Sequence, residues 1–550
     1  MNVRTSLNLY IQDSIRDNWE LLALTDFNGE SLQYRDVARK IAKLHLLFSE
    51  AGLQRGFKVA ICGKNSAQWS VAFLACITYG AVAVPVLHEF KPESIVSLVN
   101  HSDARLFFCD ESIFSEIDAE SLTTVEGVIS IADYSLLMTR SERITNARHH
   151  LNELFGRRYP ERFTRDDVEY AEMELSEPAV INYTSGSMGS PKGVVLSHRA
   201  LWSNIQYSID GLDFLLPGDG VVCMLPLAHM FGLTVDLLHC FVKGAHIYFL
   251  THRPTPRVIM EAFAQVRPKL IVTVPLIIEK IIKTKVFPLL EKPLMRLMLM
   301  VPFVDDHLLG KIKTRLTDTF GGNLQELIIG GAGLSRDVED FLRRIRFPFT
   351  VGYGMTECGP LVAYAPWDIQ RPQSCGRLVD RMEAYIDSDD PQHIPGVLWV
   401  RGDNVMTEYY KNPEATDAVF RQGWMSTGDI CTIDSDGFLY IRGRDKNMIL
   451  GPSGQNIYPE EIEQVLANLP YVEECLVVKR GERLVAIVVP DREAMKQASV
   501  PESGLSAIMK QNLEQLNREM PSYARVAEIE IRDSEFEKTP KRSIKRFLYK

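Results

Sequence analysis

The stretch from Ile181 to His198, INYTSGSMGSPKGVVLSH, carries a dense set of groups suited to binding an anion. Glycines let the backbone turn its N–H groups inward, hydroxyl side chains add uncharged donors, and one lysine adds a cation. The residues that supply these groups are Tyr183, Thr184, Ser185, Gly186, Ser187, Gly189 and Lys192. Apolar runs at 179–181 and 194–196 flank them as strands would. We therefore predict a polyphosphate-binding loop between two strands of a hairpin.

The spacing of this loop excludes a Walker motif, in which G-x-x-x-x-G-K-[ST] runs directly into a helix. Lys192 lies three residues after Gly189, follows a proline and precedes a strand-like run. A glycine- and serine-rich turn without a ligand is the alternative interpretation. The adjacent Pro-Lys-Gly favours the phosphate loop.

Two shorter motifs supply groups that suit the remaining parts of a nucleotide. The first motif is Tyr353, Gly354, Met355, Thr356 and Glu357. Its ring can lie on a purine, its threonine can touch a phosphate oxygen, and its carboxylate can hold Mg²⁺, which proteins bind through one or two carboxylates plus substrate phosphate. The second motif, STGD, ends in Asp429, whose carboxylate suits the two hydroxyls of a ribose that Arg444 can also reach. Each motif alone is also typical of an ordinary turn.

Length and composition limit the classes of protein to which the chain can belong. At 550 residues it is too long for one hydrophobic core, and 46% apolar with 24% charged residues is ordinary for a folded protein. The net charge of −10 argues against a nucleic-acid partner, which needs a basic face, but it leaves a nucleotide open. Nine scattered cysteines without a C-x-x-C spacing indicate reduced thiols rather than a zinc site or a disulfide framework.

The chain shows no pattern for export or for spanning a membrane. Its first twenty residues lack the apolar segment of a signal peptide. The apolar stretches 270–282 and 294–304 are broken by prolines and charges and fall short of the roughly 20 residues that a spanning helix needs. We expect a cytoplasmic protein, and peripheral contact with a membrane stays open. A basic patch at Arg157, Arg158 and Arg162 is more typical of a solvated connector than of a lipid or CoA contact.

Strand-like runs alternate with helical periodicity through the first 350 residues, which predicts parallel α/β sheets. The clearest strands are expected at 57–61, 81–86, 105–109 and 125–131, after an amphipathic helix at 33–52. Because ligands collect outside the carboxyl ends of parallel strands, the loops after 221–225, 270–274 and 327–329 should face one crevice.

The pattern changes twice in the last 200 residues. After residue 350 the strands become shorter and the turns denser, which predicts a β-rich subdomain. From Gly443 a charged segment rich in glycine and proline precedes a helix opened by Pro459, and further strands and a helix follow. This indicates a separate, small α+β domain. In the preceding part, Ser335 is expected to cap a helix that begins just after it.

Taken together, these motifs resemble the adenylate-forming superfamily, which comprises acyl-CoA synthetases, firefly luciferase and the adenylation domains of peptide synthetases. The signatures YTSGSMGSPKG, YGMTE, STGD and GRDKNMI follow in the family's order, and the similarity spans nearly the whole chain. Departures are Met188 where threonine is usual, Val397 where an acid is usual and Glu408 where glycine is usual. LGPSGQNIYPEEIE and the terminal KTPKRSIKRFLYK look most like the fatty-acyl-CoA ligase branch.

The resemblance implies an architecture and an activity. The architecture is a large N-terminal domain, 1–442, of parallel α/β sheets plus a β-rich subdomain, and a small mobile α+β domain, 443–550, that pivots near Lys446. The activity is that of an ATP-dependent acyl-CoA synthetase: a carboxylic acid, with a medium-to-long-chain fatty acid expected, forms acyl-AMP with release of pyrophosphate and is then transferred to coenzyme A. The alternatives are a ligase that loads a carrier protein and a non-catalytic relative that binds nucleotide and acyl groups.

The resemblance also assigns roles to single residues. Those expected at the β and γ phosphates are Thr184, Ser185, Gly186, Ser187 and Lys192. Those expected around adenine and ribose are Gly330, Gly331, Ala332, Tyr353, Asp429 and Arg444. Glu357 with Thr184 is expected to hold Mg²⁺, His229 to gate the acyl pocket, and the loop containing Gly454 to meet phosphopantetheine.

One departure affects the chemistry directly. The family's catalytic lysine lies in a Thr-x-x-Gly-Lys-Ile-x-Arg pattern, and aligning Thr539 and Ile544 places Ser543 on that lysine. Serine cannot neutralise the carboxylate and the α-phosphate. Either Lys541 or Lys545 replaces the lysine, or adenylation is slow; a basic solvated tail is the alternative interpretation.

Overall fold

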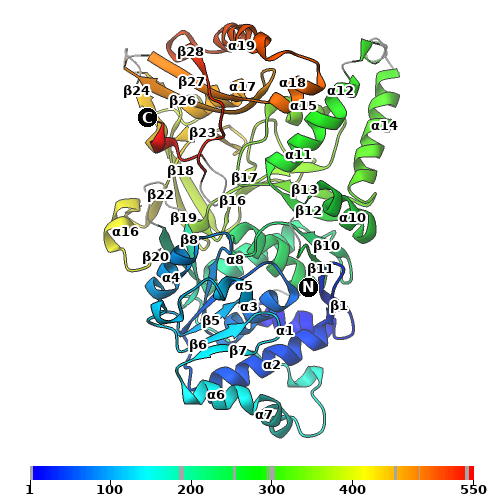
Figure 1. The fold of residues 1–550 in the computed structure, drawn as a ribbon, viewed down its shortest axis with the longest axis vertical. Helices are drawn as coiled ribbons and strands as arrows, with labels where there is room; N and C mark the ends of the chain where they lie inside the picture. Colours follow the sequence, from blue (N-terminus) through cyan, green and yellow to red (C-terminus); the bar gives the residue numbers. More distant parts are fainter. Residues whose placement is uncertain are drawn as a thin grey trace.

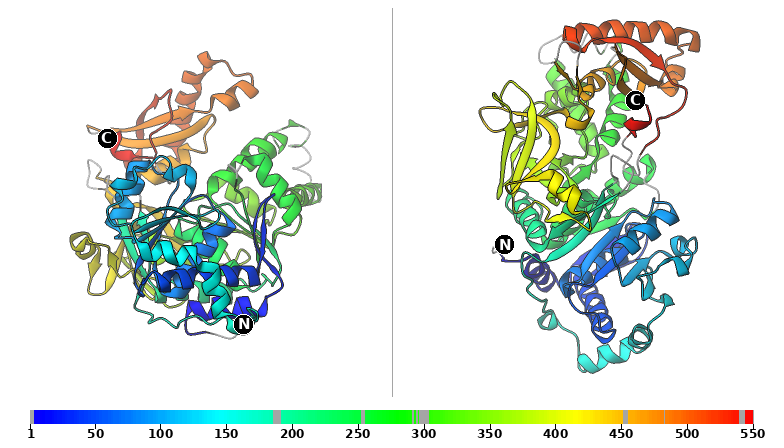
Figure 2. Two further views of the ribbon diagram at one scale, coloured as in Figure 1. Left: turned by 60° about the horizontal axis from the view of Figure 1, so that its bottom comes forward. Right: turned by 90° about the vertical axis from the view of Figure 1, so that its left-hand side faces the viewer.

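The computed structural model describes residues 4–184, 191–251, 255–290, 292–293, 295, 304–450, 455–481, 483–538 and 544–549. It shows the predicted α/β architecture, a large N-terminal domain of parallel sheets followed by a smaller C-terminal domain. Figure 1 and Figure 2 show the smaller domain (orange to red) at one end of the molecule and part of the largest sheet (blue to cyan) at the other.

The largest sheet has eight strands in the order β20-β9-β8-β4-β3-β5-β6-β7. Its strands are β3 (Lys58–Cys62), β4 (Val82–Val86), β5 (Leu106–Cys109), β6 (Gly127–Ser130), β7 (Leu136–Thr139), β8 (Pro178–Thr184), β9 (Lys192–Ser197) and β20 (Glu408–Tyr409). Strands β3 to β6 and β8 are parallel, whereas β7, β9 and β20 pair antiparallel with their neighbours. Every residue of β4 is buried, as expected for a parallel strand covered on both faces.

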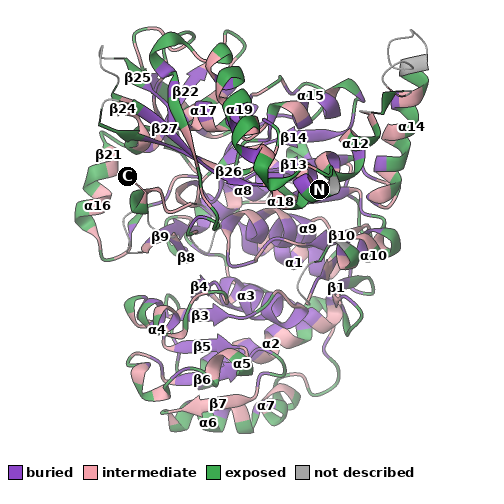
Figure 3. Cartoon of the chain, turned by 45° about the horizontal axis from the view of Figure 1, so that its top comes forward, coloured by how far each residue is buried: buried purple, intermediate pink, exposed green. Residues whose placement is uncertain are grey.

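Two hydrophobic cores lie on the two faces of this sheet. Successive side chains of a strand point to opposite faces, so Val180 enters one core and Ile181 the other. Helices on the Val180 face are α1 (Leu7–Asp17), α2 (Tyr34–Glu50), α3 (Ala67–Tyr79) and α8 (His198–Gly211), with α4 (Pro92–His101) on the other face. The shorter helices after β5 and β7 are α5 (Glu111–Phe114), α6 (Glu142–His149) and α7 (Leu151–Arg158). Figure 3 shows the inner strands buried and α6 and α7 largely exposed.

Two further sheets complete the α/β part of the large domain. One has the order β10-β11-β1-β2 and consists of β10 (Gly220–Cys223), β11 (His246–Phe249), β1 (Leu22–Asp26) and β2 (Ser31–Gln33). The other is parallel and consists of β12 (Leu270–Thr273), β13 (Glu326–Ile329) and β14 (Phe349–Val351). The accompanying helices are η3 (Gly232–His239), α9 (Cys240–Val242), α10 (Pro256–Val266), α11 (Pro275–Ile281), η4 (Ile282–Val286), α12 (Phe287–Leu290), α14 (Val304–Thr319) and α15 (Arg336–Arg344).

The β-rich subdomain predicted after residue 350 is present. Its strands are β15 (Tyr353–Gly354), β16 (Leu361–Tyr364), β17 (Arg377–Leu378), β18 (Met382–Asp387), β19 (Gly396–Gly402), β21 (Phe420–Arg421), β22 (Trp424–Ile433) and β23 (Leu439–Arg444). Its helices are η5 (Thr356–Cys358) and α16 (Pro413–Val419). Strand β23 pairs with β22 through Arg444. The sheet of the large domain therefore continues two residues beyond the boundary expected at 442.

The C-terminal domain folds around a three-stranded sheet, β26-β27-β28. Its elements are β24 (Ile449–Leu450), β25 (Asn456–Ile457), α17 (Pro459–Leu466), β26 (Val472–Arg480), β27 (Arg483–Pro490), α18 (Arg492–Gln497), α19 (Leu505–Glu519), β28 (Val526–Ile531) and η9 (Arg546–Leu548). Ile462 and Leu466 of α17 enter its core. This is the α+β unit expected from the sequence.

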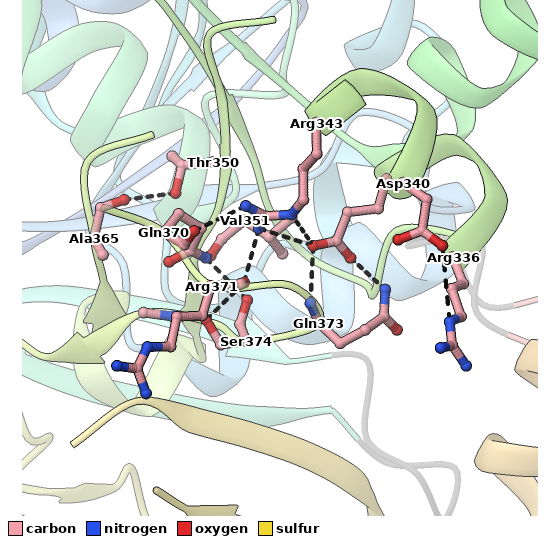
Figure 4. Close-up of polar contacts among 12 residues, drawn as sticks. Arg336, Asp340, Arg343, Thr350, Val351, Ala365, Gln370, Arg371, Gln373 and Ser374 are labelled. Atoms are coloured by element: carbon pink, nitrogen blue, oxygen red, sulfur yellow. Dashed lines mark hydrogen bonds and ion pairs between the residues drawn. The ribbon is translucent and has the colours of Figure 1, made fainter. Parts of the chain in front are cut away.

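A buried carboxylate anchors the turn through which the large domain contacts the small one. Glu339 of α15 is 3% exposed at its side chain and accepts hydrogen bonds from Arg343 and from the Gln373 main chain, at 2.9 and 2.8 Å. Arg343 also donates to the carbonyl of Gln370, and Figure 4 shows Arg343, Gln370 and Gln373 close together. The amide oxygen of Gln373 in turn accepts from Gln464 of α17 at 3.0 Å. The small domain therefore meets a turn that is already fixed in place.

The prediction that the Ser335 side chain caps the following helix is wrong. Ser335 occupies the N-cap position of α15, but its side chain makes no capping hydrogen bond, and its hydroxyl oxygen is buried without a partner in the described structure. Its main-chain N–H donates instead to Glu279 at 2.7 Å. A tertiary contact has replaced the local one.

Two of the sequence expectations concern the whole chain. In the part that the structure describes, no helix combines the length and the apolar character needed to cross a membrane. All nine cysteines lie in the described ranges and are free thiols, and every one except Cys475 is buried.

Glu326, the first residue of β13, makes stability depend on pH. Its carboxylate is buried and accepts hydrogen bonds from the Tyr364 hydroxyl and the Trp367 main chain, at 2.8 and 3.1 Å. Burial raises its pKa to about 7, with the nearby charge of Asp368 acting in the same direction. Since the folded chain holds this proton more tightly, its stabilising contribution is complete below the usual glutamate pKa near 4.5 and is lost as pH rises through about 7.

The variant Glu326→Gln keeps an acceptor oxygen and removes the charge. We expect it to unfold at nearly the same temperature as the unmodified protein at pH 5 and a few degrees higher at pH 8, since each unit of pKa shift corresponds to about 1.4 kcal/mol. Thermal unfolding followed across this pH range measures the difference. Glu383→Gln, at an exposed position paired with Arg401, is the control and should show no such trend. An equal difference at both pH values would contradict the assignment.

Candidate active site

The predicted phosphate loop lies where β8 turns back into β9. The two strands form the expected antiparallel hairpin, and Thr184 stands opposite Lys192 at the end of the hairpin where the loop connects the strands. The Thr184 hydroxyl lies 3.5 Å from the Lys192 carbonyl oxygen. The loop residues Ser185, Gly186, Ser187 and Gly189 fall outside the described residues, as does Gly454, so their roles stay predictions.

The residues just before the loop point to opposite faces of the sheet. Tyr183 is 4% exposed, and its hydroxyl lies 2.7 Å from Nδ1 of His101, so its ring is directed away from the Thr184 face. On that face, buried Asn182 donates to the carbonyl of Ala228 at 2.8 Å. Asn182 thereby joins the hairpin to the loop that carries His229. Sequence reasoning missed this residue.

Glu357 and Lys192 both contact the side chain of one tyrosine, Tyr409. The Tyr409 hydroxyl donates to Oε1 of Glu357 at 2.8 Å, and Nζ of Lys192 lies 4.6 Å from the centroid of the Tyr409 ring. This arrangement arises because β20 pairs with β9, which places Tyr409 opposite Val194. Tyr409 is a second residue that sequence reasoning missed.

The donors at this point fit a magnesium ion shared with a substrate phosphate. The Glu357 carboxylate and the Thr184 hydroxyl are hard oxygen donors, and Mg²⁺ is commonly bound by one or two carboxylates plus phosphate oxygens. Among the described residues, no three or more His, Cys, Asp or Glu side chains are grouped to hold a metal ion. Such an ion would neutralise charge on the phosphates, with Glu357 as its protein carboxylate.

The structure brings together three residues expected at the ribose and the adenine. Asp429 is 2% exposed; Nε of Arg444 lies 2.6 Å from one of its oxygens, and the Tyr353 hydroxyl donates to the other at 2.5 Å. The register of β22 with β23 sets Asp429 opposite Arg444. Burial raises the pKa of Asp429, while Arg444 and Tyr353 act in the opposite direction. The ring of Tyr353 is itself buried.

Glycines allow two close approaches at this site. A Cβ at Gly330 would lie 2.9 Å from the ring of Phe231, so only glycine lets that ring pack there. A Cβ at Gly354 would collide with the carbonyl oxygen of Pro360.

The other predicted residues of these two motifs differ in exposure. Gly331 and Ala332, which follow β13, are exposed. Met355 and Thr356 are partly buried beside Glu357.

His229 and Lys446 approach the same region from two other segments. His229 is half-buried in the loop after β10, and Thr234 of the following helix donates to the Gly359 carbonyl at 3.1 Å. Lys446 lies in the short helix η6 (Asp445–Asn447), two residues after the end of β23. Burial lowers its pKa and Arg444 adds to this effect, whereas Asp429 and Glu357 oppose it. Lys446 therefore lies within the electrostatic range of both site carboxylates.

Two described basic residues of the C-terminal tail, Lys545 and Arg546, pair with acids of the small domain. Nζ of Lys545 lies 3.4 Å from Glu537, and Arg546 contacts Glu463 at 2.7 Å. Lys541 and Ser543 fall outside the described residues. In this conformation Lys545 is paired with Glu537 rather than with the site.

A family model described as AMP-binding enzyme matches residues 11–410 of this chain. The chain belongs to that family. A second model, AMP-binding enzyme C-terminal domain, matches residues 461–542. The resemblance read from the sequence is thus confirmed, and the protein is a member of the adenylate-forming superfamily of acid–CoA ligases.

Named relatives show the range of acids within this family. The chain is 29% identical over 501 residues to a long-chain-fatty-acid–CoA ligase of Escherichia coli O157:H7, covering 86% of this chain and 83% of that one. It is 28% identical over 485 residues to 4-coumarate:CoA ligase 1 of Petunia hybrida, covering 84% and 80%. The crystal structure of ATP-bound MatB from Rhodopseudomonas palustris shares the fold with a TM-score of 0.76 at 23% identity, covering 99% and 98%.

Proposed function

We propose that this protein is an AMP-forming fatty-acid–CoA ligase that acts on medium-to-long-chain acids. The observation that carries the proposal is the convergence of Lys192, Glu357 and the Asp429–Arg444 pair, which supplies groups suited to phosphate, Mg²⁺ and ribose around one region. The choice of a fatty acid is supported by the long-chain-fatty-acid ligases among its relatives and by the terminal motifs.

In the proposed reaction a carboxylate oxygen of the acid attacks the α-phosphorus of ATP. The bond between the α-phosphorus and the oxygen that bridges it to the β-phosphorus breaks. Pyrophosphate leaves with the electron pair of that bond. The thiolate of coenzyme A then attacks the acyl carbon, and AMP departs as the leaving group. Lys192 and Asp429 contribute by holding phosphate and ribose, so that catalysis is mainly positioning and charge neutralisation.

A panel of acids tests this proposal. Purified protein is incubated with ATP, Mg²⁺ and CoA, and pyrophosphate and acyl-CoA are measured for octanoate, palmitate, 4-coumarate and a short dicarboxylate. We expect octanoate or palmitate to give both products. Preference for 4-coumarate would show that the substrate is an aromatic acid and not a fatty acid. A parallel incubation with hydroxylamine traps acyl-AMP as the acyl-hydroxamate, with AMP as the leaving group. Pyrophosphate and this hydroxamate without CoA thioester would indicate a carrier protein as acceptor, and no product with any acid would favour a non-catalytic relative.

A further inference from the structure

We propose that Tyr409 is a positioning residue that orients Glu357 with its hydroxyl and Lys192 with its ring, so that both are ready for the phosphates of ATP. The proposal rests on the function proposed above and extends it to a residue outside the recognised motifs. Its basis is a single side chain in contact with both charged groups.

Main-chain hydrogen bonds fix the position of Tyr409. Its N–H donates to the Thr416 hydroxyl at 3.0 Å, and its carbonyl accepts from the Asn412 N–H at 3.0 Å. Strand β20 pairs it with Val194, and its side chain is 6% exposed. A buried ring held at both main-chain groups has little freedom to reorient.

The hydroxyl bond determines how the carboxylate of Glu357 is presented. Oε1 accepts a hydrogen bond from the Tyr409 hydroxyl, and the main-chain oxygen of Glu357 accepts one from the Met406 N–H at 2.8 Å. A hydrogen bond to an ionised acceptor is stronger than one between neutral groups. With Oε1 engaged in this way, the hydrogen bond restricts the orientation of the carboxylate, and its second oxygen can be directed to a metal ion.

The ring provides a binding place for the ammonium of Lys192. At 4.6 Å from the centroid, Nζ lies within the roughly 6 Å over which an aromatic face attracts a cation. In the described structure no ion pair joins Lys192 to Glu357, although both contact this tyrosine. Tyr409 thus keeps two opposite charges close without letting them neutralise each other.

Two substitutions separate the two contacts. Tyr409→Phe removes the hydroxyl and keeps the ring, whereas Tyr409→Leu removes both. Tyr410→Phe is a matched control, because the neighbouring hydroxyl donates to Asp103 at 2.7 Å, away from both charged groups. The probe is the α,β-methylene analogue of ATP, which cannot be adenylated, and its binding is measured by calorimetry with and without Mg²⁺.

For Tyr409→Phe we expect the Mg²⁺ concentration for half-maximal enhancement of binding to rise about 5-fold, with Mg²⁺-free affinity within about 2-fold of wild type. For Tyr409→Leu we expect Mg²⁺-free affinity to fall by a further factor of about 5. Tyr410→Phe should change neither. In a Glu357→Gln background, Tyr409→Phe should have less than about a 2-fold effect, because the carboxylate through which the hydroxyl acts is gone.

An unchanged Mg²⁺ dependence in Tyr409→Phe, or an equal effect of this substitution with and without Glu357, would overturn the proposal. The Glu357→Gln comparison decides the matter even if Tyr409→Leu does not fold. Wild-type protein that binds no analogue would overturn the proposed function, and this proposal with it. The two failures are therefore distinguishable.

Discussion

Replacing Lys192 with alanine should slow acyl-adenylate formation by about 10²- to 10³-fold, the cost typical of removing one preorganised group that stabilises developing charge. Lys192 is the lysine of the proposed phosphate loop, and its ammonium lies 4.6 Å from the centroid of the Tyr409 ring, at the loop end of the hairpin. Pyrophosphate–ATP exchange with the preferred acid measures this step alone. Lys411→Ala is a nearby control, because Lys411 pairs with Asp103 on the surface.

Lys446→Ala should slow the second half-reaction, transfer to CoA, more than the first, which is the reverse of the effect of Lys192→Ala. Lys446 lies two residues after the last strand of the large domain, where the chain enters the small domain. We expect it to slow transfer from synthetic acyl-AMP to CoA by about 10-fold or more, while exchange falls by less than about 3-fold. Equal losses in both steps for Lys446→Ala would contradict its role as a hinge, and a loss confined to the second step for Lys192→Ala would contradict the phosphate loop.

Local pattern predicted most of the architecture and several of the site contacts. The β8–β9 hairpin follows from two apolar runs around a glycine-rich loop, and the parallel sheets follow from alternating periods. The STGD motif and Arg444 are predicted to bind one sugar, and the register of β22 with β23 brings Asp429 and Arg444 into contact. These features depend on neighbours in sequence or on strands that follow one another closely.

The residues that were missed depend on long-range pairing. Tyr409 reaches the site because β20 joins the edge of a sheet built mainly from the first 200 residues; the neighbouring Thr407 bonds to Val195 across 212 positions. No local spacing indicates such a contact. The orientation of Tyr183 was within reach of the sequence, because strand alternation sets it on the opposite face from Thr184. At Ser335 the local pattern predicts the N-cap position correctly but not the hydrogen bond. The main chain of Ser335 bonds to Glu279, which is distant in sequence, and its side chain makes no capping bond.

The sequence of the C-terminal tail suggests a substitution at Ser543 that should increase the rate of acyl-adenylate formation. The basic residues on both sides of 539–543 are paired with acids of the small domain: Lys538 with Glu474, Lys545 with Glu537 and Arg546 with Glu463. In the described conformation these cations are committed to carboxylates. The carboxylate substrate and the α-phosphate are both negative, so their approach needs a positive charge that serine at 543 does not supply.

The variant Ser543→Lys should therefore speed acyl-adenylate formation by about 10- to 100-fold, measured by pyrophosphate exchange at saturating acid and ATP. Ser543→Gln adds similar length without charge and should leave the rate near that of the unmodified protein. If Lys541 now takes the place of the missing lysine, Lys541→Ala should slow the unmodified protein and have little effect once Ser543→Lys is present. A rate for Ser543→Lys no higher than that for Ser543→Gln would show that position 543 does not approach the reacting groups. The adenylation step would then depend on a cation from elsewhere in the chain, and Lys446, which already lies near Asp429 and Glu357, would be the first to test.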